Sequence, residues 1–198
     1  MGLNHLIALL AGAINVYAFW MYNKDVFLDK GTKPNAATWS IWAIVTSVQA
    51  TSYNAMGVHW SKLVVMGSDT ILCVVTFLFL LFAGKFSKLD KESRLIIALS
   101  AVAFVSWQAV SATWGNILSQ IPYAMAFWPT IRDTRNRKTL EVPRVWVLFT
   151  VSFAFSLIVV YLEWPDNKWE FLFPIVAIIM HSFIAYYAFR GKAEEETK

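Results

Sequence analysis

The sequence predicts an all-α membrane protein with seven transmembrane helices, and three observations support this fold class. The chain has 198 residues, of which 58% are hydrophobic and only 15% are charged, whereas roughly 25% charged is usual in soluble domains. Its apolar residues gather in seven stretches, each close to the ~20 residues that a helix needs to cross a bilayer. Its lysines and arginines fall almost entirely in every second loop, as in multi-span proteins.

The seven apolar stretches follow one another with short loops between them. They cover residues 3–22, 37–57, 63–84, 95–112, 114–131, 145–162 and 169–189. Each can span the ~30 Å hydrocarbon core as a helix. Residues 1–198 are therefore predicted to form a single transmembrane domain that ends in a cytoplasmic tail at 191–198.

Basic residues set the predicted orientation of this integral membrane protein. Fifteen of the 17 Lys and Arg residues fall on one side, namely Lys24, Lys30, Lys33, Lys85, Lys88, Lys91, Arg94, Arg132, Arg135, Arg137, Lys138, Arg144, Arg190, Lys192 and Lys198. The other side receives only Lys62 and Lys168. By the positive-inside rule, the N-terminus lies outside and the C-terminus in the cytoplasm. The net charge of +4 follows from this bias and does not indicate nucleic-acid binding.

An internal repeat divides the chain into 3 + 1 + 3 helices. The matched segments, at offsets of 108 and then 107, are Ala18-Phe19-Trp20 with Ala126-Phe127-Trp128, Thr32 with Thr139, Trp39 with Trp146, and Phe82-x-Gly84-Lys85 with Phe189-x-Gly191-Lys192. Repeat one is predicted over 3–84 and repeat two over 114–190, as parallel copies joined by an inversion linker helix at 95–112. Span ends favour such residues in general, so shared interfacial composition is the alternative explanation.

The second half also carries a motif that resembles the PQ-loop repeat of SWEET-type transporters. Its segments are Gln120-Ile121-Pro122-Tyr123, Trp128-Pro129-Thr130-Ile131-Arg132 and Arg135-x-Arg137-Lys138-Thr139. Thr130 stands where the family usually has Gln, and the first repeat has Met21-Tyr22 in place of Pro-Gln. The resemblance implies a 3 + 1 + 3 fold. Related proteins include carriers of sugars, amino acids and vitamins, and a receptor for retrieval signals.

Polar side chains at mid-span are the candidate substrate-binding residues, because an unsatisfied polar group is costly in hydrocarbon. They are Asn15, Gln49, Tyr53, Asn116, Gln120, Tyr123 and His181. Those of the second span share one helix face by their spacing, as do those of the fifth. A shared cavity is predicted, and hydrogen bonds between helices, worth only ~0.6 kcal/mol each, are the alternative.

One carboxylate and three prolines complete the candidate site. Asp69 is the only acidic residue deep inside a predicted span, so it is the candidate for proton coupling; a structural hydrogen bond or a wet vestibule is the alternative. Pro122 and Pro129 in the fifth span and Pro174 in the seventh each lack a backbone N–H. They are candidate hinges, with static kinks as the alternative.

Other residue types exclude several kinds of site. The ten tryptophans lie near predicted span ends, which predicts an interfacial belt, with Trp42 and Trp107 as the deepest exceptions. Cys73 is the only cysteine, so no disulfide can form within the chain. Without a catalytic Ser/His/Asp order, a metal-ligand pair or a phosphate loop, we expect no enzymatic activity, metal or cofactor.

The sequence favours a transporter that moves a small polar solute by alternating access, either passively or coupled to protons. A sugar, an amino acid or a nucleoside-like molecule fits this description. The expected partners are the solute and the lipid bilayer, and a homo-oligomer is compatible with the sequence. The alternative is a non-transporting seven-helix receptor or membrane scaffold that binds a peptide or protein. A sealed interior favours the scaffold, and a polar cavity that reaches one membrane face favours transport.

Overall fold

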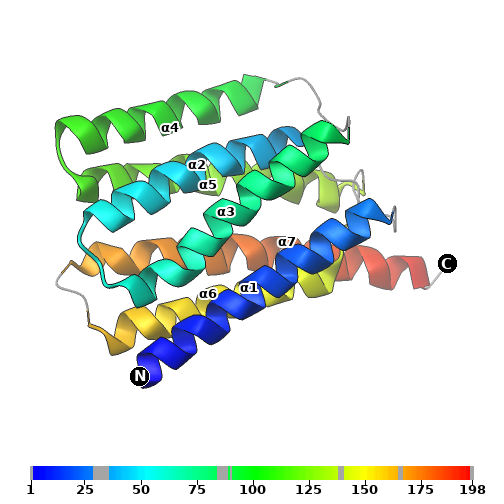
Figure 1. The fold of residues 1–198 in the computed structure, drawn as a ribbon. Coiled ribbons are helices and arrows are strands. Elements are labelled where there is room, and N and C mark those ends of the chain that lie inside the picture. The colour runs from blue at the N-terminus through cyan, green and yellow to red at the C-terminus, as the bar shows by residue number, and fades with distance from the viewer. Residues whose placement is uncertain are drawn as a thin grey trace.

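The structure, a computed structural model, describes residues 2–28, 36–83, 89, 91–137, 141–164 and 167–196. Within these ranges the chain is all-helical (Figure 1). The α-helices are α1 Leu3–Phe27, α2 Ala36–Ala55, α3 Trp60–Phe82, α4 Lys91–Ala109, α5 Ala112–Arg135, α6 Pro143–Leu162 and α7 Leu172–Glu196, with a short 3-10 helix, η1 Lys168–Phe171, before α7. Each apolar stretch predicted from the sequence coincides with one of these α-helices.

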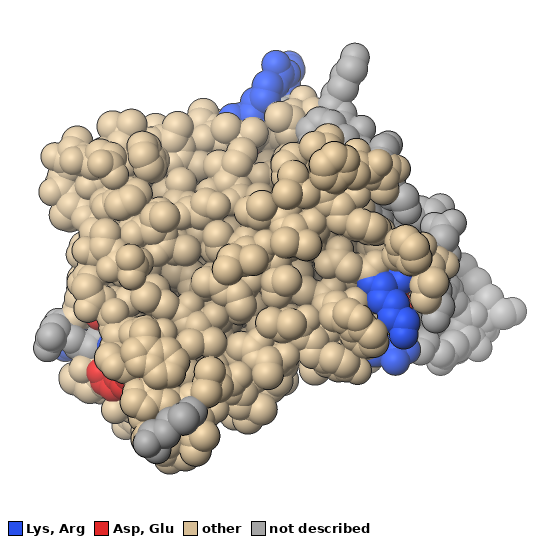
Figure 2. Space-filling model, in the orientation of Figure 1, with Lys and Arg blue, Asp and Glu red and all other residues tan. Residues whose placement is uncertain are grey.

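Four segments are long and apolar enough to cross a membrane. They are Leu3–Phe27, Trp60–Phe82, Pro143–Leu162 and Lys168–Gly191, which correspond to α1, α3, α6 and η1 with α7. Large apolar side chains cover their outer faces, as a lipid-facing surface requires. Figure 2 shows one such face of the bundle, on which charged side chains lie only along the edges. The length and apolar composition of these four helices therefore indicate a membrane protein.

The remaining helices are long but more polar. Helix α2 carries Gln49 among several Ser and Thr residues, and α5 carries Asn116 and Gln120. Helix α4 begins with charged side chains. Gln49, Asn116 and Gln120 point into the bundle and are buried, so other helices cover these polar side chains of α2 and α5.

Six helices form a ring, and the seventh lies outside it. Packing contacts run from α1 to α3, α2, α5, α7, α6 and back to α1. Helix α4 packs on the outside, against α5 and α2. In both α1–α3 and α5–α7 the third helix packs against the other two. The buried core therefore lies inside a ring to which these two groups of three helices contribute in the same way.

The two ends of the bundle differ in charge. Consecutive helices run in opposite directions, so the N-terminus and the C-terminus lie at opposite ends (Figure 1). The end that holds the C-terminus, here called the basic end, carries Lys24, Lys91, Arg94, Arg132, Arg135, Arg137, Arg144 and Arg190 among the described residues. The opposite end, here called the N-terminal end, carries Lys62 and Lys168 in the same ranges. The cation asymmetry of the sequence is thus an asymmetry between the two ends of the folded bundle.

A glycine lets α4 and α5 approach closely. The two helices are joined by only two residues, and Ser111 caps α5 by accepting a hydrogen bond from the backbone N–H of Trp114 at 3.3 Å. A Cβ atom at Gly115 would lie 2.3 Å from Cβ and 2.9 Å from Cα of Trp107. Because the second of these atoms belongs to the backbone of α4, a larger residue at this position must push the helices apart.

We expect Gly115→Ala to destabilise the bundle by about 1–3 kcal/mol, the usual cost of overpacking. Thermal unfolding of the purified protein in detergent measures this loss. Gly67→Ala is the matched control, because a Cβ atom at Gly67 in α3 meets no atom within 4 Å. The control should be as stable as the parent or slightly more stable, since alanine favours helix. Equal stability of Gly115→Ala and the parent would contradict the close packing of α4 on α5.

Candidate functional site

A narrow cavity lies inside the ring, and every ring helix contributes to its wall. The lining residues are Phe19, Trp39, Trp42, Thr46, Asp69, Cys73, Tyr123, Phe127, Trp146, Phe149 and His181. Helix α4 contributes no described residue to this wall. The space between the side chains measures about 260 Å³, but the part that can hold the centre of a water molecule is only about 10 Å³. That is room for roughly one water, so the side chains nearly fill the cavity in this conformation.

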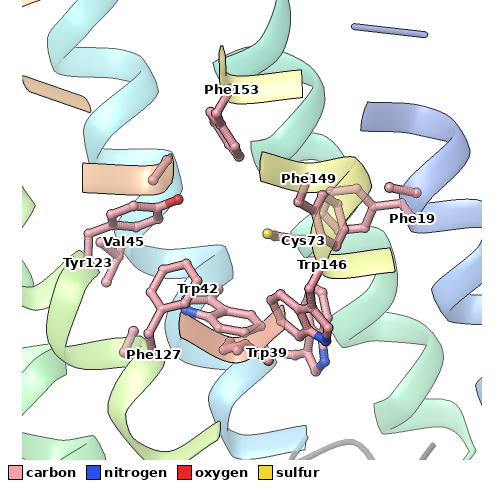
Figure 3. Close-up of a cluster of buried hydrophobic side chains, with 14 of the residues drawn as sticks. Phe19, Trp39, Trp42, Val45, Cys73, Tyr123, Phe127, Trp146, Phe149 and Phe153 are labelled. Carbon is pink, nitrogen blue, oxygen red and sulfur yellow. The ribbon is translucent and has the colours of Figure 1, made fainter. Parts of the chain in front are cut away.

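Aromatic rings form most of the cavity wall (Figure 3). The Trp42 ring lies 4.8 Å from that of Trp39 and 5.0 Å from that of Phe127. On the opposite side, the Phe19 and Phe149 rings are 4.9 Å apart in an edge-to-face arrangement. Such pairs add about 0.5–1.5 kcal/mol each beyond their buried area. The wall is therefore well packed, and its ring faces suit an apolar or ring-shaped part of a ligand.

The tryptophans of this wall differ in how their indole N–H groups are satisfied. Trp39 Nε1 donates to the hydroxyl of Tyr22 at 3.1 Å, and Trp146 Nε1 donates to Oε2 of Glu141 at 3.0 Å. Trp42 Nε1 is buried and has no hydrogen-bond partner within the described part of the chain. Trp39 and Trp146 are thus held by the protein itself, whereas the Trp42 N–H remains available to a ligand.

The prediction of an interfacial belt is wrong for two of these tryptophans. Trp39 and Trp146 are only 2% and 1% exposed, because each lies near the start of its helix on the inward face and has a polar partner inside the bundle. Trp42, expected to be one of the deepest, is buried as well, whereas Trp107 is half-buried between α4 and α5. Six others are exposed, as a belt requires: Trp20, Trp60, Trp114, Trp128, Trp164 and Trp169.

A smaller polar part of the wall contains Asp69, Tyr123 and His181. His181 Nδ1 lies 2.7 Å from the carbonyl oxygen of Ala177, so Nδ1 carries the proton that it donates to this oxygen. The Tyr123 hydroxyl is buried without a partner among the described residues. Asp69 and His181 line the same cavity, with no ion pair between them in the described ranges. A carboxyl group, a hydroxyl and an imidazole therefore share one cavity inside the bundle.

The seven predicted substrate-binding residues are all buried, but the structure divides them into two sets. Tyr123 and His181 line the cavity, together with Asp69. The others lie in the core outside its wall: Asn15, Gln49, Tyr53, Asn116 and Gln120. None of the seven is exposed on the outer surface of the bundle.

Several of the core residues join helices through hydrogen bonds. Gln49 Nε2 donates to Oε1 of Gln120 at 3.1 Å, which links α2 to α5. Asn15 Nδ2 donates to Oγ of Ser68 at 3.0 Å, which links α1 to α3. Yet Asn15 Oδ1, Gln49 Oε1 and both amide atoms of Asn116 are buried without a partner in the part of the chain that is described. Interhelical bonding accounts for only some of these polar atoms.

Two of the candidate hinge prolines lie inside a helix. Pro122 and Pro129 are buried within the continuous helix α5. Pro174 instead lies in the first turn of α7, which begins at Leu172, later than the predicted span start at 169. A first-turn N–H has no partner within the helix, so Pro174 breaks no mid-helix hydrogen bond. Only α5 contains the break in hydrogen bonding that was predicted for these prolines.

Glu141 at the basic end belongs to the site but was not predicted from the sequence. It lies just before α6, outside any predicted span, and its side chain is buried beneath Trp146. Burial raises the pKa of Glu141 to about 8, and the hydrogen bond from Trp146 opposes this shift. Near neutral pH, the carboxyl that holds Trp146 in the cavity wall is therefore mostly protonated.

At the N-terminal end of the bundle, a buried ion pair joins two helices. Lys62 Nζ at the start of α3 lies 2.8 Å from Oε2 of Glu170 in η1, and both side chains are buried. Buried ion pairs of this kind are costly to break by removing one partner. The pair therefore ties the first group of three helices to the second at this end.

Aromatic wall residues were also missed, although the sequence carried a signal for them. Phe19 and Phe127 occupy matching positions of the internal repeat, as do Trp39 and Trp146, and all four line the cavity. The matched Trp20 and Trp128 are both about half exposed, at 53% and 54%. These three pairs of matched positions thus have similar environments.

Comparison of this chain with protein families, with curated proteins and with solved structures finds no match.

Proposed function

We propose that this protein is a membrane transporter that moves a small polar solute through the cavity of the helix ring. The observation that carries the proposal is a buried cavity with polar atoms that lack partners. Trp42 Nε1 and the Tyr123 hydroxyl belong to wall residues and are unpartnered among the described residues. Buried polar groups are nearly always hydrogen-bonded, and a buried polar group without a hydrogen bond costs about 1–3 kcal/mol of stability. A solute, or the water that it displaces, would satisfy them.

The chemistry of the wall suggests the class of solute. Aromatic faces bind sugar rings, nucleobases and apolar side chains, while Asp69 accepts hydrogen bonds from hydroxyl or ammonium groups. The Trp42 N–H and the Tyr123 hydroxyl can donate to oxygen atoms of the solute. A sugar, an amino acid or a nucleoside-like molecule meets these requirements. The wall contains no described Lys or Arg, so it does not favour a multiply charged anion.

Packing symmetry supports an architecture of two parallel repeats, with all seven helices crossing the membrane and α4 as the linker. The third helix of each group packs against the other two, and α1 contacts α6 as α5 contacts α2. The ring pairs Phe19–Phe149 and Phe127–Trp42, at 4.9 Å and 5.0 Å, are exchanged when one repeat is mapped onto the other. Such symmetry favours a SWEET-like carrier over a receptor, because exchange of two equivalent halves gives alternating access.

Alternating access needs a gate at each end. At the N-terminal end, Lys62 and Glu170 join the two repeats. Toward the basic end, Trp39 and Trp146 line the cavity from the starts of α2 and α6, and their rings lie 4.8 Å and 6.0 Å from the ring of Trp42. In the proposed cycle, the nearly filled cavity represents a state in which both gates are shut. Pro122 and Pro129 leave α5 with fewer backbone hydrogen bonds, so α5 is the natural place for bending when a gate opens.

The proposed orientation, with the basic end in the cytoplasm, is tested by labelling single cysteines from outside. Lys168→Cys and Asn136→Cys form a matched pair, because both residues are exposed and lie at opposite ends of the bundle. Both are made in a Cys73→Ser background, which removes the only native cysteine. A membrane-impermeant maleimide should modify position 168 in intact cells and position 136 only after permeabilisation. Labelling of position 136 in intact cells would reverse the orientation.

Solute transport is tested by uptake into proteoliposomes across labelled sugars, amino acids and nucleosides. Once a solute is found, Tyr123→Phe should weaken its binding about 2- to 13-fold, which corresponds to a hydrogen bond of about 0.5–1.5 kcal/mol. Tyr161→Phe is the control, because Tyr161 is exposed on α6 and loses the same hydroxyl. Absence of uptake and binding for every solute class would reject the transporter and favour the receptor or scaffold.

Proton coupling through Asp69 is tested separately from solute binding. Asp69→Asn keeps the shape of the side chain but cannot release a proton. In a coupled carrier, this variant should lose accumulation driven by a pH gradient while solute exchange continues. Glu92→Gln, which removes an exposed carboxylate at the basic end, should behave as the parent. Uptake that is independent of pH in the parent would show a passive carrier and leave Asp69 with a structural role.

A further inference from the structure

Two histidines and a glutamate from distant parts of the sequence meet at the N-terminal end. His5 lies in the first turn of α1, His59 precedes α3, and Glu163 follows α6. One candidate ligand atom from each of the three lies within 4.8 Å of the others. His59 Nδ1 lies 3.5 Å from Oε1 of Glu163, and the His5 and His59 rings stack at 5.4 Å. The cluster lies at the opposite end of the bundle from Glu141 and takes no part in the cavity wall.

The donor set matches that of a transition-metal site. Two imidazoles and one carboxylate are a known protein ligand set of zinc, with a fourth position left for water. Ligand atoms ~2.0–2.1 Å from a tetrahedral metal lie ~3.3 Å apart, close to the observed 3.5 Å between His59 and Glu163. The His59 side chain is 49% exposed, so it can rotate to close the remaining distances.

Both histidines are held through Nδ1 at this end of the bundle. His5 Nδ1 accepts from the backbone N–H of Gly2 at 3.2 Å, and His59 Nδ1 lies 3.4 Å from the backbone nitrogen of Ser61 and 2.8 Å from its Oγ. A ring nitrogen that accepts a hydrogen bond carries a lone pair. Each imidazole therefore brings a ring nitrogen to the cluster, and a metal ion binds the imidazole through a ring nitrogen that carries no proton.

The glutamate is the member of the cluster that most needs a cation. Glu163 Oε1 accepts hydrogen bonds from Asn4 Nδ2 and Ser61 Oγ, but Oε2 is buried without a partner among the described residues. No Lys or Arg in these ranges forms an ion pair with Glu163. The buried Lys62 at the same end is already paired with Glu170. Oxygen atoms of a buried carboxylate are costly to leave unpaired, and a metal ion removes that cost.

We propose that His5, His59 and Glu163 form a binding site for a divalent transition-metal ion, with Zn²⁺ as the best fit. Asn4 and Ser61 orient the carboxylate from outside the ligand set. Because α1 and α3 lie in the first group of three helices and α6 in the second, the bound ion fastens the two groups together at the N-terminal end. It thereby reinforces the Lys62–Glu170 contact. Its effect on transport, which rests on the proposed function, is to hold this gate shut.

Metal binding is measured on the full-length protein, purified without a polyhistidine tag and titrated with ZnCl₂ by calorimetry. We expect one Zn²⁺ per chain and a raised unfolding temperature. His5→Asn, His59→Asn and Glu163→Gln should each weaken binding at least tenfold. His181→Gln is the matched control, because His181 is the third and last histidine of the chain and lies in the cavity. Failure of the parent to bind Zn²⁺ would overturn the site. Binding by the His5 and His59 variants that is as tight as that of the parent would also overturn it.

A second measurement needs no variant and therefore does not depend on how the variants fold. Zn²⁺ should protect His5 and His59 of the parent from modification by diethyl pyrocarbonate, as read by mass spectrometry, and unchanged modification would reject the site.

Neither assay needs a transported solute, so the metal site and the proposed transport fail independently. Where uptake is established, external Zn²⁺ should slow it in the parent and not in His59→Asn. Unslowed uptake with Zn²⁺ bound would reject the closing of the gate.

Discussion

The polar side chains of the ring helices must be kept away from hydrocarbon, and the rest of the structure depends on this constraint. In the proposed seven-span arrangement, an isolated α2 or α5 would expose Gln49, Asn116 or Gln120 to lipid, where their hydrogen-bonding groups have no partner. The ring places these side chains inside and leaves the apolar faces of α1, α3, α6 and α7 outside. A closed ring of six helices with a polar interior follows, and a small cavity remains where the side chains do not fill it.

Inside the ring, aromatic packing and incomplete hydrogen bonding have opposite consequences. The stacked and edge-to-face rings around Trp42 and Phe149 give the wall a defined shape. The unpartnered amide, indole and hydroxyl groups of Asn116, Trp42 and Tyr123 leave the interior short of polar contacts. A core selected only for stability would pair or remove such groups. Two of these residues, Trp42 and Tyr123, lie in the cavity wall, where the proposed solute would supply the missing contacts.

The two ends of the bundle are closed by different chemistry. At the N-terminal end, Lys62 pairs with Glu170, and His5, His59 and Glu163 form the proposed metal site. At the basic end, large rings line the cavity, and one of them is held by the buried carboxyl of Glu141. A bound cation would act on the first end, whereas the protonation of Glu141 changes the strength of its hydrogen bond with Trp146 at the second. The two proposed gates are therefore open to separate control.

Helix positions, their polar faces and the imbalance of basic residues could be predicted from the sequence, because hydropathy and charge act locally along the chain. The burial of Asn15, Gln49, Gln120 and His181 followed from the same reasoning, since polar groups avoid lipid wherever the helices pack. Which of them reach the cavity did not follow: that depends on how far each helix rotates about its axis when it packs. Trp39 and Trp146 show the limit most clearly, because a tryptophan near a span end can face lipid or the interior with the same hydropathy. The meeting of His5, His59 and Glu163 was decided by tertiary structure alone, since these residues are far apart in the sequence and only the packing of α1, α3 and α6 brings their side chains within coordination distance.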